Sequence, residues 1–237
     1  ADMVDVDFGA AYTKSKYIEQ GRGYIVASIA EEKINSGEYD IYRPNANPSQ
    51  VLQSFTALVG RDGEWDQKEI YGTAAMEFMK LDGGGAQVLV GAEWREEHYQ
   101  DLYDSLSEAG QILGSAGNSA GGTRDVTSLY AEMFLPFSKT LEVQLAGRYE
   151  KYSDYGSDFS PKASFRWKAM PTLALRGSIG TGFRAPSLPV LTAKTSFSAE
   201  SVFDPVTCTV LGTGPDDECQ VNTFIQSNSE LSSEQSD

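Results

Sequence analysis

The sequence has little positive charge and few of the residues that usually build catalytic or metal centres. Its 237 residues include 34 acidic side chains against 19 Lys and Arg, with one histidine and two cysteines. The formal net charge of −15 argues against a nucleic-acid partner, because phosphate binding needs a basic surface. A Ser-His or Asp-His mechanism would depend on His98 alone, which follows Glu96 and Glu97 and is expected to be solvated. We therefore predict no catalytic residue, no metal site and no cofactor.

Long apolar runs are also missing. No stretch of 18 or more apolar residues occurs, so no transmembrane helix is predicted. The first residues lack the charged start and apolar core of a signal peptide, and residues 227–237 are polar and do not read as a strand. Both ends look like cuts through a longer chain.

The chain consists largely of segments of about ten residues in which apolar and polar side chains alternate, which is typical of half-buried or membrane-facing strands. The clearest one places Leu173, Leu175, Ile179 and Phe183 opposite Arg176. Arginines on the second face fit a wall between lipid and water. About seven antiparallel strands are predicted, near 4–13, 70–80, 87–95, 128–135, 141–150, 160–168 and 173–184.

The connections between these strands alternate in length. Short turns are expected near 83, 138 and 171, where glycine or proline occurs, and a medium one near 155. Long connections are expected at 20–66, 104–124 and 184–237. Short turns at one end and long loops at the other are the pattern of outer-membrane barrels, with the short turns periplasmic and the loops extracellular.

A soluble β-sandwich also has alternating strands and is the main competing interpretation of the fold. Aromatic residues near the ends of the strands favour a membrane barrel, because such residues form girdles at lipid interfaces. These residues are Tyr12, Trp94, Phe134, Tyr149, Phe165, Trp167 and Phe183.

Three motifs resemble the barrel of TonB-dependent outer-membrane receptors. The most specific is Gly-Phe-Arg-Ala-Pro-Ser at 182–187, which in that family ends a late strand. Gly-Ala-Glu-Trp-Arg-Glu-Glu at 91–97 and Gly-Arg-Tyr-Glu-Lys-Tyr-Ser at 147–153 are similar to two other strands of these receptors. The stretch 228–234 is a weaker match, because serines stand where the family has prolines.

The resemblance implies an all-β antiparallel transmembrane segment, about seven strands of a 22-stranded barrel, without the plug or the C-terminal strands. It implies energy-dependent uptake of a scarce solute, such as siderophore-bound iron, across the outer membrane of a Gram-negative bacterium, and no enzyme activity. The expected partners are outer-membrane lipid, the receptor's own plug, the TonB energy-coupling protein and a small-molecule solute, with the receptor a monomer. A soluble binding or adhesion module and an outer-membrane barrel enzyme remain as alternatives.

The polar face of the strands would then line the lumen. Its charged side chains are candidates for contact with the plug or the solute, or they form ion pairs with one another across neighbouring strands. The candidates are Glu93, Arg95, Glu132, Arg148, Glu150, Arg166, Arg176 and Arg184, and Arg184, at the rim, is the strongest single candidate.

Two local features lie in the expected loops. Cys208 and Cys219 are eleven residues apart, and a loop built through an oxidising periplasm favours a disulfide between them over a metal site. Residues 47–60 have an N-cap, a proline at the first helical position and a terminal glycine, so they predict a helix with one apolar stripe. Such a helix either packs on its own loop or forms part of a binding surface.

Overall fold

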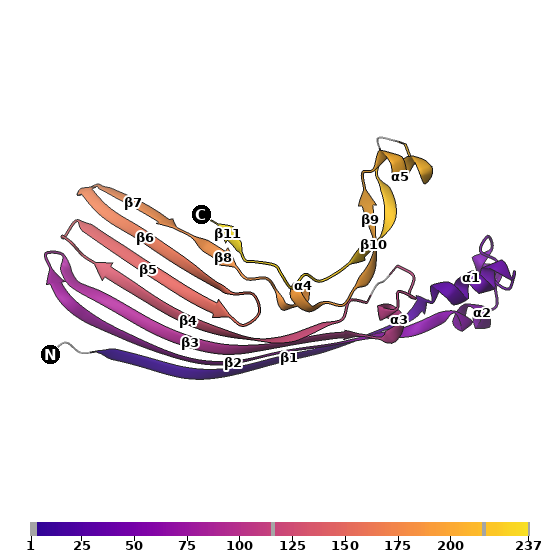
Figure 1. Cartoon of the computed structure of the whole chain (residues 1–237), viewed down its shortest axis with the longest axis horizontal. Coiled ribbons are helices and arrows are strands. Elements are labelled where there is room, and N and C mark those ends of the chain that lie inside the picture. The colour runs from indigo at the N-terminus through magenta and orange to yellow at the C-terminus, as the bar shows by residue number, and fades with distance from the viewer. Residues whose placement is uncertain (1–3, 115–116, 215–216, 237) are drawn as a thin grey trace.

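The computed structural model describes residues 4–114, 117–214 and 217–236, and seven of its strands form one antiparallel sheet in sequence order. Short stretches of the expected connections at 104–124 and 184–237 lie outside the described residues. The sheet is curved and open, with β1 and β7 as its edges (Figure 1). Its strands are β1 (Asp5–Ile25), β2 (Thr56–Leu81), β3 (Gly84–Tyr103), β4 (Ala120–Leu135), β5 (Leu141–Tyr152), β6 (Ser157–Met170) and β7 (Leu173–Gly180).

The remaining elements lie in the long connections, which gather at one end of the sheet while the short turns lie at the other (Figure 1). No helix within the described residues is long and apolar enough to cross a membrane. These elements are α1 (Ala27–Asn35), η1 (Pro44–Ala46), α2 (Ser49–Ser54), α3 (Ser105–Glu108), β8 (Gly182–Arg184), α4 (Leu188–Thr192), β9 (Ser196–Val202), α5 (Pro205–Val210), β10 (Cys219–Ile225) and β11 (Glu234–Ser236).

The apolar face of the sheet is uncovered. Phe8 is 81% exposed and Ile179 is 79% exposed, and within the described residues no second sheet packs on this face. A β-sandwich would bury these side chains against a second layer. The predicted antiparallel sheet is confirmed, and the sandwich alternative does not fit it.

The apolar band on this outer face ends along one row of the sheet. Ile70 pairs with Ala10 on one side and Trp94 on the other, whereas two residues further along Lys68 pairs with Tyr12 and Glu96. Between this row and the short turn that joins them, β2 and β3 have about eleven residues each, the length that a tilted strand needs to cross a bilayer. Strands β1, β2 and β3 continue well beyond the row, so their upper parts stand above the membrane-spanning band.

These long strands change the predicted connections. Residues 20–25 and 56–66, expected in a loop, belong to β1 and β2, where 20–25 pair with 56–60, so that connection covers only 26–55. The predicted helix at 47–60 is half right: α2 ends at Ser54, and β2 begins at Thr56. Cross-strand hydrogen bonds to β1 outweigh the local helical pattern there, because residues 56–60 have partners in the sheet.

Two aromatic residues expected in the girdle lie on the inner face instead. Phe134 shares its face with Gln144, its register partner, and lines a hollow there. Phe183 places its ring 6.3 Å from that of Tyr152. The strand is interrupted between Gly180 and Gly182, so the alternation of β7 does not continue into β8.

The three short turns lie where they were predicted. They join β2 to β3, β4 to β5 and β6 to β7. Two of them touch, since the amide of Gly83 donates to the carbonyl of Pro136 over 3.1 Å. A Cβ atom at Gly83 would lie 2.4 Å from the Ser138 carbonyl oxygen, so this close approach requires glycine.

Candidate solute path on the inner face

Charged side chains of β3, β4 and β5 form a continuous chain of ion pairs on the inner face, called here the inner ladder. Arg95 donates to Glu93 over 2.9 Å and to Glu97 over 2.8 Å. Arg148 donates to Glu150 over 2.6 Å and to Glu93 over 3.1 Å. The ladder consists of Glu93, Arg95, Glu97, Arg124, Arg148 and Glu150, so three arginines neutralise three glutamates.

The ladder is covered by the chain itself. Ser128 is fully buried and Glu150 nearly so, although both project from the inner face of the sheet. Residues 183–194 lie over the ladder's upper end, at Arg124 and Tyr152; within them Leu188 and Leu191 are buried, and α4 packs on β4. The segment returns to the wall at Lys194, whose amide donates to the Ser119 carbonyl over 2.8 Å.

Arg124 fixes this covering segment to the sheet. Its guanidinium donates to Glu97 over 2.7 Å and to the Pro186 carbonyl over 2.8 Å, and it lies 5.3 Å from the centre of the Tyr152 ring. Burial alone would raise the pKa of Glu97, but hydrogen bonds from Arg124 and Arg95 lower it below its ordinary value. Sequence reasoning missed Arg124, because its partners come from strands and loops distant in the sequence.

A second buried cluster lies on the inner face above the ladder. Asp101, only 4% exposed, accepts hydrogen bonds from Arg61 over 2.8 and 2.6 Å, from the Tyr17 hydroxyl over 2.8 Å and from the Tyr99 hydroxyl over 3.2 Å. The Arg61 hydrogen bonds hold the pKa of Asp101 below its usual range. Burial and the bond to Asp101 raise the pKa of Tyr17 to about 12.

The Arg61 guanidinium also lies over two rings, 4.7 Å from the centre of Tyr103 and 5.3 Å from that of Tyr17. Such cation–π contacts add to the ion pair in holding the guanidinium in place. Tyr17 lies across Gly63, its partner in the β1–β2 register, and a Cβ atom there would collide with the ring. This cluster was also missed, although the spacing of Tyr99, Asp101 and Tyr103 on one face was a visible signal.

The part of the inner face near the short turns is open. One hollow of about 540 Å³ is lined by Arg166, Glu142 and Arg176, and another of about 400 Å³ by Glu132 and Lys162. Arg166 donates from Nε to Glu142 over 2.8 Å. Among the described residues, Arg176, Glu132 and Lys162 have no ion pair, and all three are exposed. Arg176 moreover stands opposite Arg166 in the register, so like charges face each other.

Arg184, the strongest single candidate from the sequence, stands apart from both groups. It belongs to β8, its side chain is 78% exposed, and its Nη1 lies 3.6 Å from a carboxylate oxygen of Glu234 in β11. An exposed pair at this distance contributes little to stability. Arg184 is therefore accessible to a partner.

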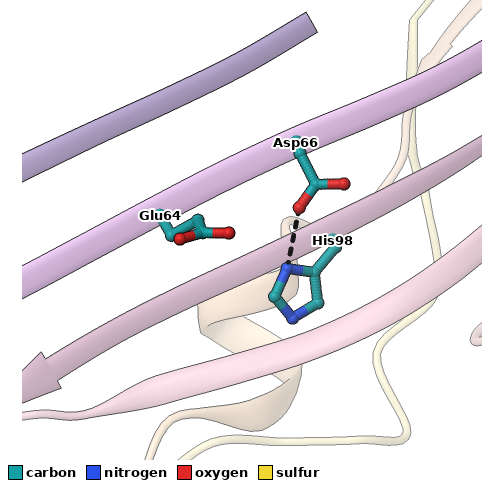
Figure 2. A group of neighbouring side chains, drawn as sticks. All are labelled: Glu64, Asp66 and His98. Atoms are coloured by element: carbon teal, nitrogen blue, oxygen red, sulfur yellow. Dashed lines mark hydrogen bonds and ion pairs between the residues drawn. The ribbon is translucent and has the colours of Figure 1, made fainter. Parts of the chain in front are cut away.

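A cluster on the opposite, outer face brings Glu64, Asp66 and His98 together (Figure 2). His98 Nδ1 lies 3.2 Å from Asp66, and ligand atoms of all three residues lie within 4.8 Å of one another. Lys14 and Lys16 both pair with Glu64 and lower its pKa to about 2. Two ammonium groups thus occupy the carboxylate that a metal ion would need, and the cluster is an ion-pair group on the outer wall.

The predicted disulfide between Cys208 and Cys219 is present in the structure, with the Cα atoms 5.2 Å apart. It joins α5 to the start of β10. Strands β9 and β10 pair along their whole length, so the disulfide closes a hairpin within the long connection after β8.

Comparison with known proteins places this geometry in a family. The profile described as "TonB dependent receptor-like, beta-barrel" matches residues 5–237. The chain belongs to the TonB-dependent receptor β-barrel family. The strands, the outer apolar band and the charged inner face are those of its barrel wall.

One solved structure similar to this TonB-dependent receptor segment is the siderophore receptor PirA from Acinetobacter baumannii. The TM-score is 0.54 at 16% sequence identity, and the match covers 76% of this chain and 28% of PirA. At this identity the likeness concerns the fold. The chain thus spans little more than a quarter of that receptor's length, and no curated protein sequence matches it.

Proposed function

We propose that this chain forms part of the barrel of a receptor that takes up a scarce solute, such as siderophore-bound iron, across the outer membrane of a Gram-negative bacterium. The energy would come from TonB through a plug inside the barrel. In this proposal the short turns are periplasmic and the long connections extracellular. Family membership and the open, charged lower inner face support it.

The single observation that carries the proposal is the set of charged side chains on the lower inner face that form no ion pair among the described residues. Arg176, Glu132 and Lys162 project into open hollows and have no ion pair among the described residues. In a complete barrel, lipid surrounds the wall and a plug fills the lumen. The plug would supply partners for these side chains, because charged groups facing a protein interface need compensation. We propose that the plug contacts concentrate here, and that the solute passes along the same face.

A barrel enzyme is the less favoured alternative. The one histidine of the chain lies on the outer face, on the side of Trp94 and Glu96, away from the inner face where a solute would pass. The family and its structural neighbour are receptors. We therefore propose that this chain carries out no catalysis.

Transport in cells that express the complete receptor tests the proposal. Uptake of iron loaded on a catecholate or a hydroxamate chelate would be measured with and without TonB, for the unchanged receptor and for Arg176→Gln with Glu132→Gln. We expect TonB-dependent uptake that falls about tenfold in the double variant, about 1.4 kcal/mol, because contacts with the plug are lost. Arg184→Ala should also reduce uptake without loss of membrane insertion.

Equal uptake with and without TonB would contradict the energy coupling. Unchanged uptake in the double variant, at an equal amount of receptor in the outer membrane, would remove the lower inner face from the solute path. Lys139→Gln is the matched control, because Lys139 lies in the turn between β4 and β5, outside both hollows.

A further inference from the structure

Apolar side chains are exposed at the tip of the hairpin of β9 and β10, which rises away from the sheet with α5 at its end (Figure 1). Val206 and Val210, one helical turn apart on α5, are 75% and 83% exposed, and Phe203 and Leu211 beside the helix are exposed as well. Cys208, on the other face of α5, is fully buried. The four exposed apolar side chains are called here the tip surface.

The chain itself holds the tip surface in place. The disulfide between Cys208 and Cys219 joins α5 to β10. The Asp204 carboxylate caps α5 by accepting from the Val206 amide over 3.1 Å, and the Thr213 hydroxyl donates to the Cys208 carbonyl over 2.8 Å. A partner that binds a fixed surface does not have to order a loop first, so these apolar side chains are ready for docking.

The hairpin and the chain after it carry only negative charge. No lysine or arginine follows Lys194 in the sequence. Within the described residues, Glu200, Asp217 and Glu218 are exposed and form no ion pair. Glu218 directly precedes Cys219, so the disulfide brings it close to α5. The hairpin therefore combines an apolar tip surface with carboxylates that have no cation of their own.

The connection between β1 and β2 differs in this respect. Lys33 pairs there with Glu38 over 2.7 Å, and Arg43 pairs with Asp40 over 2.8 Å. The exposed side chain of Ile41 thus lies next to a charge that is already paired. A basic partner would gain less at this connection than at the hairpin, because electrostatic complementarity needs charges that are free to pair.

We infer that the tip surface docks a protein segment that carries both basic and apolar side chains and reaches the receptor from outside the cell. The apolar side chains of this partner cover Val206 and Val210. Its lysines or arginines pair with Glu200, Asp217 and Glu218. An anionic lipid surface is disfavoured, because its phosphates and these carboxylates repel one another. The inference rests on the proposed function for the extracellular position of the hairpin.

The test uses the complete receptor in a non-ionic detergent and two dye-labelled peptides, Lys-Trp-Lys-Trp-Lys and Glu-Trp-Glu-Trp-Glu. Fluorescence anisotropy measures the binding of each peptide, after subtraction of its binding to empty micelles. We expect the basic peptide to bind at least about tenfold more tightly than the acidic one, and more weakly as salt is added. Val206→Ser with Val210→Ser, and separately Glu200→Gln with Glu218→Gln, should each weaken its binding about fivefold.

Ile41→Ser is the matched control, because Ile41 is exposed in a different connection and its loss should leave peptide binding unchanged. Equal binding of the two peptides, or binding of the basic peptide that survives both double variants, would overturn the inference. Displacement of the basic peptide by dihexanoylphosphatidylglycerol, a soluble anionic lipid, would assign the tip surface to lipid instead.

Intact cells that produce the receptor separate this inference from the proposed function. Suppose that binding of the basic peptide to the solubilised receptor depends on Val206 and Val210, but that intact cells show no such dependence. The docking surface would then stand, and the extracellular position of the long connections would be contradicted. TonB-dependent uptake by a receptor with no preference for the basic peptide would remove the docking surface and leave the transport proposal standing.

Discussion

Arg95 and Arg176 both project from the inner face of the same sheet, yet their surroundings differ. Arg95 is largely buried between Glu93 and Glu97, whereas Arg176 is exposed in a hollow opposite another arginine. The charges of the ladder are thus paired within the chain, whereas on the lower half Arg176, Glu132 and Lys162 have no ion pair among the described residues. A polar face can therefore be structural at one height and available for binding at another.

The largest loss of stability is expected from a substitution in the inner ladder. Arg95→Leu takes one of the two arginine partners from each of Glu93 and Glu97 in a buried setting, which should cost about 3 kcal/mol of unfolding free energy. Urea unfolding of the complete receptor in detergent micelles measures it. Glu132→Gln, on the open half, is the matched control and should stay within about 0.5 kcal/mol. Equal effects of both changes would show that the two halves do not differ.

A smaller loss of stability is expected where residues 183–194 dock on the sheet. Arg124→Leu removes the hydrogen bond to the Pro186 carbonyl and should weaken the docking of residues 183–194 by about 2 kcal/mol. Amide hydrogen exchange should then be faster at α4, which packs on β4, than in the unchanged receptor. Exchange at the hairpin of β9 and β10, whose pairing does not involve Arg124, should remain the same. Unchanged exchange at α4 would show that Leu188 and Leu191 suffice to hold the cover.

The smallest effect concerns pH. The pKa of Asp101 is lowered from its usual 3.8, so its ion pair stabilises the upper wall fully above about pH 4 and is lost as the pH falls through the lowered value. Hydrogen exchange of β3 above the ladder, compared at about pH 5 and about pH 3 and corrected for the intrinsic rate, should show this loss. Asp101→Asn should lack this acid dependence. An equal acid effect in that variant would assign it to other carboxylates.

The sequence predicted those parts of the fold that depend on neighbouring residues. Alternation identified the membrane-spanning strands, and glycine or proline identified the short turns, because both signals are local. The disulfide was also predictable, since the chain has only two cysteines. The upper parts of the strands were not predictable from the sequence. Charged residues such as Lys14 and Lys16 occur there on the outer face, so the two faces no longer differ in polarity.

The sequence predicted which charged side chains lie on the inner face. It did not predict that some form the paired inner ladder while others remain exposed near the short turns. Alternation placed Arg95, Arg148 and Arg176 on the inner face, but their partners depend on the strand register and on which loop folds inward. The cluster of Arg61, Asp101 and Tyr17 joins three strands, which no local pattern relates. Phe183 lies on the inner face because the strand is interrupted after Gly180. The alternation of apolar and polar residues alone does not show this interruption.

The strands that continue past the row of Ile70 and Trp94 also set the height of the receptor's outer surface. From Ile70 to the start of β2 the strand would rise about 30 Å above the lipid, allowing for strand tilt. These upper parts of β1, β2 and β3, with their lysine and carboxylate pairs, form a collar. In the proposed orientation an antibody or a phage meets the collar before it reaches the lipid. Because the backbone there is hydrogen-bonded between neighbouring strands, the height of this surface does not depend on the loops above it.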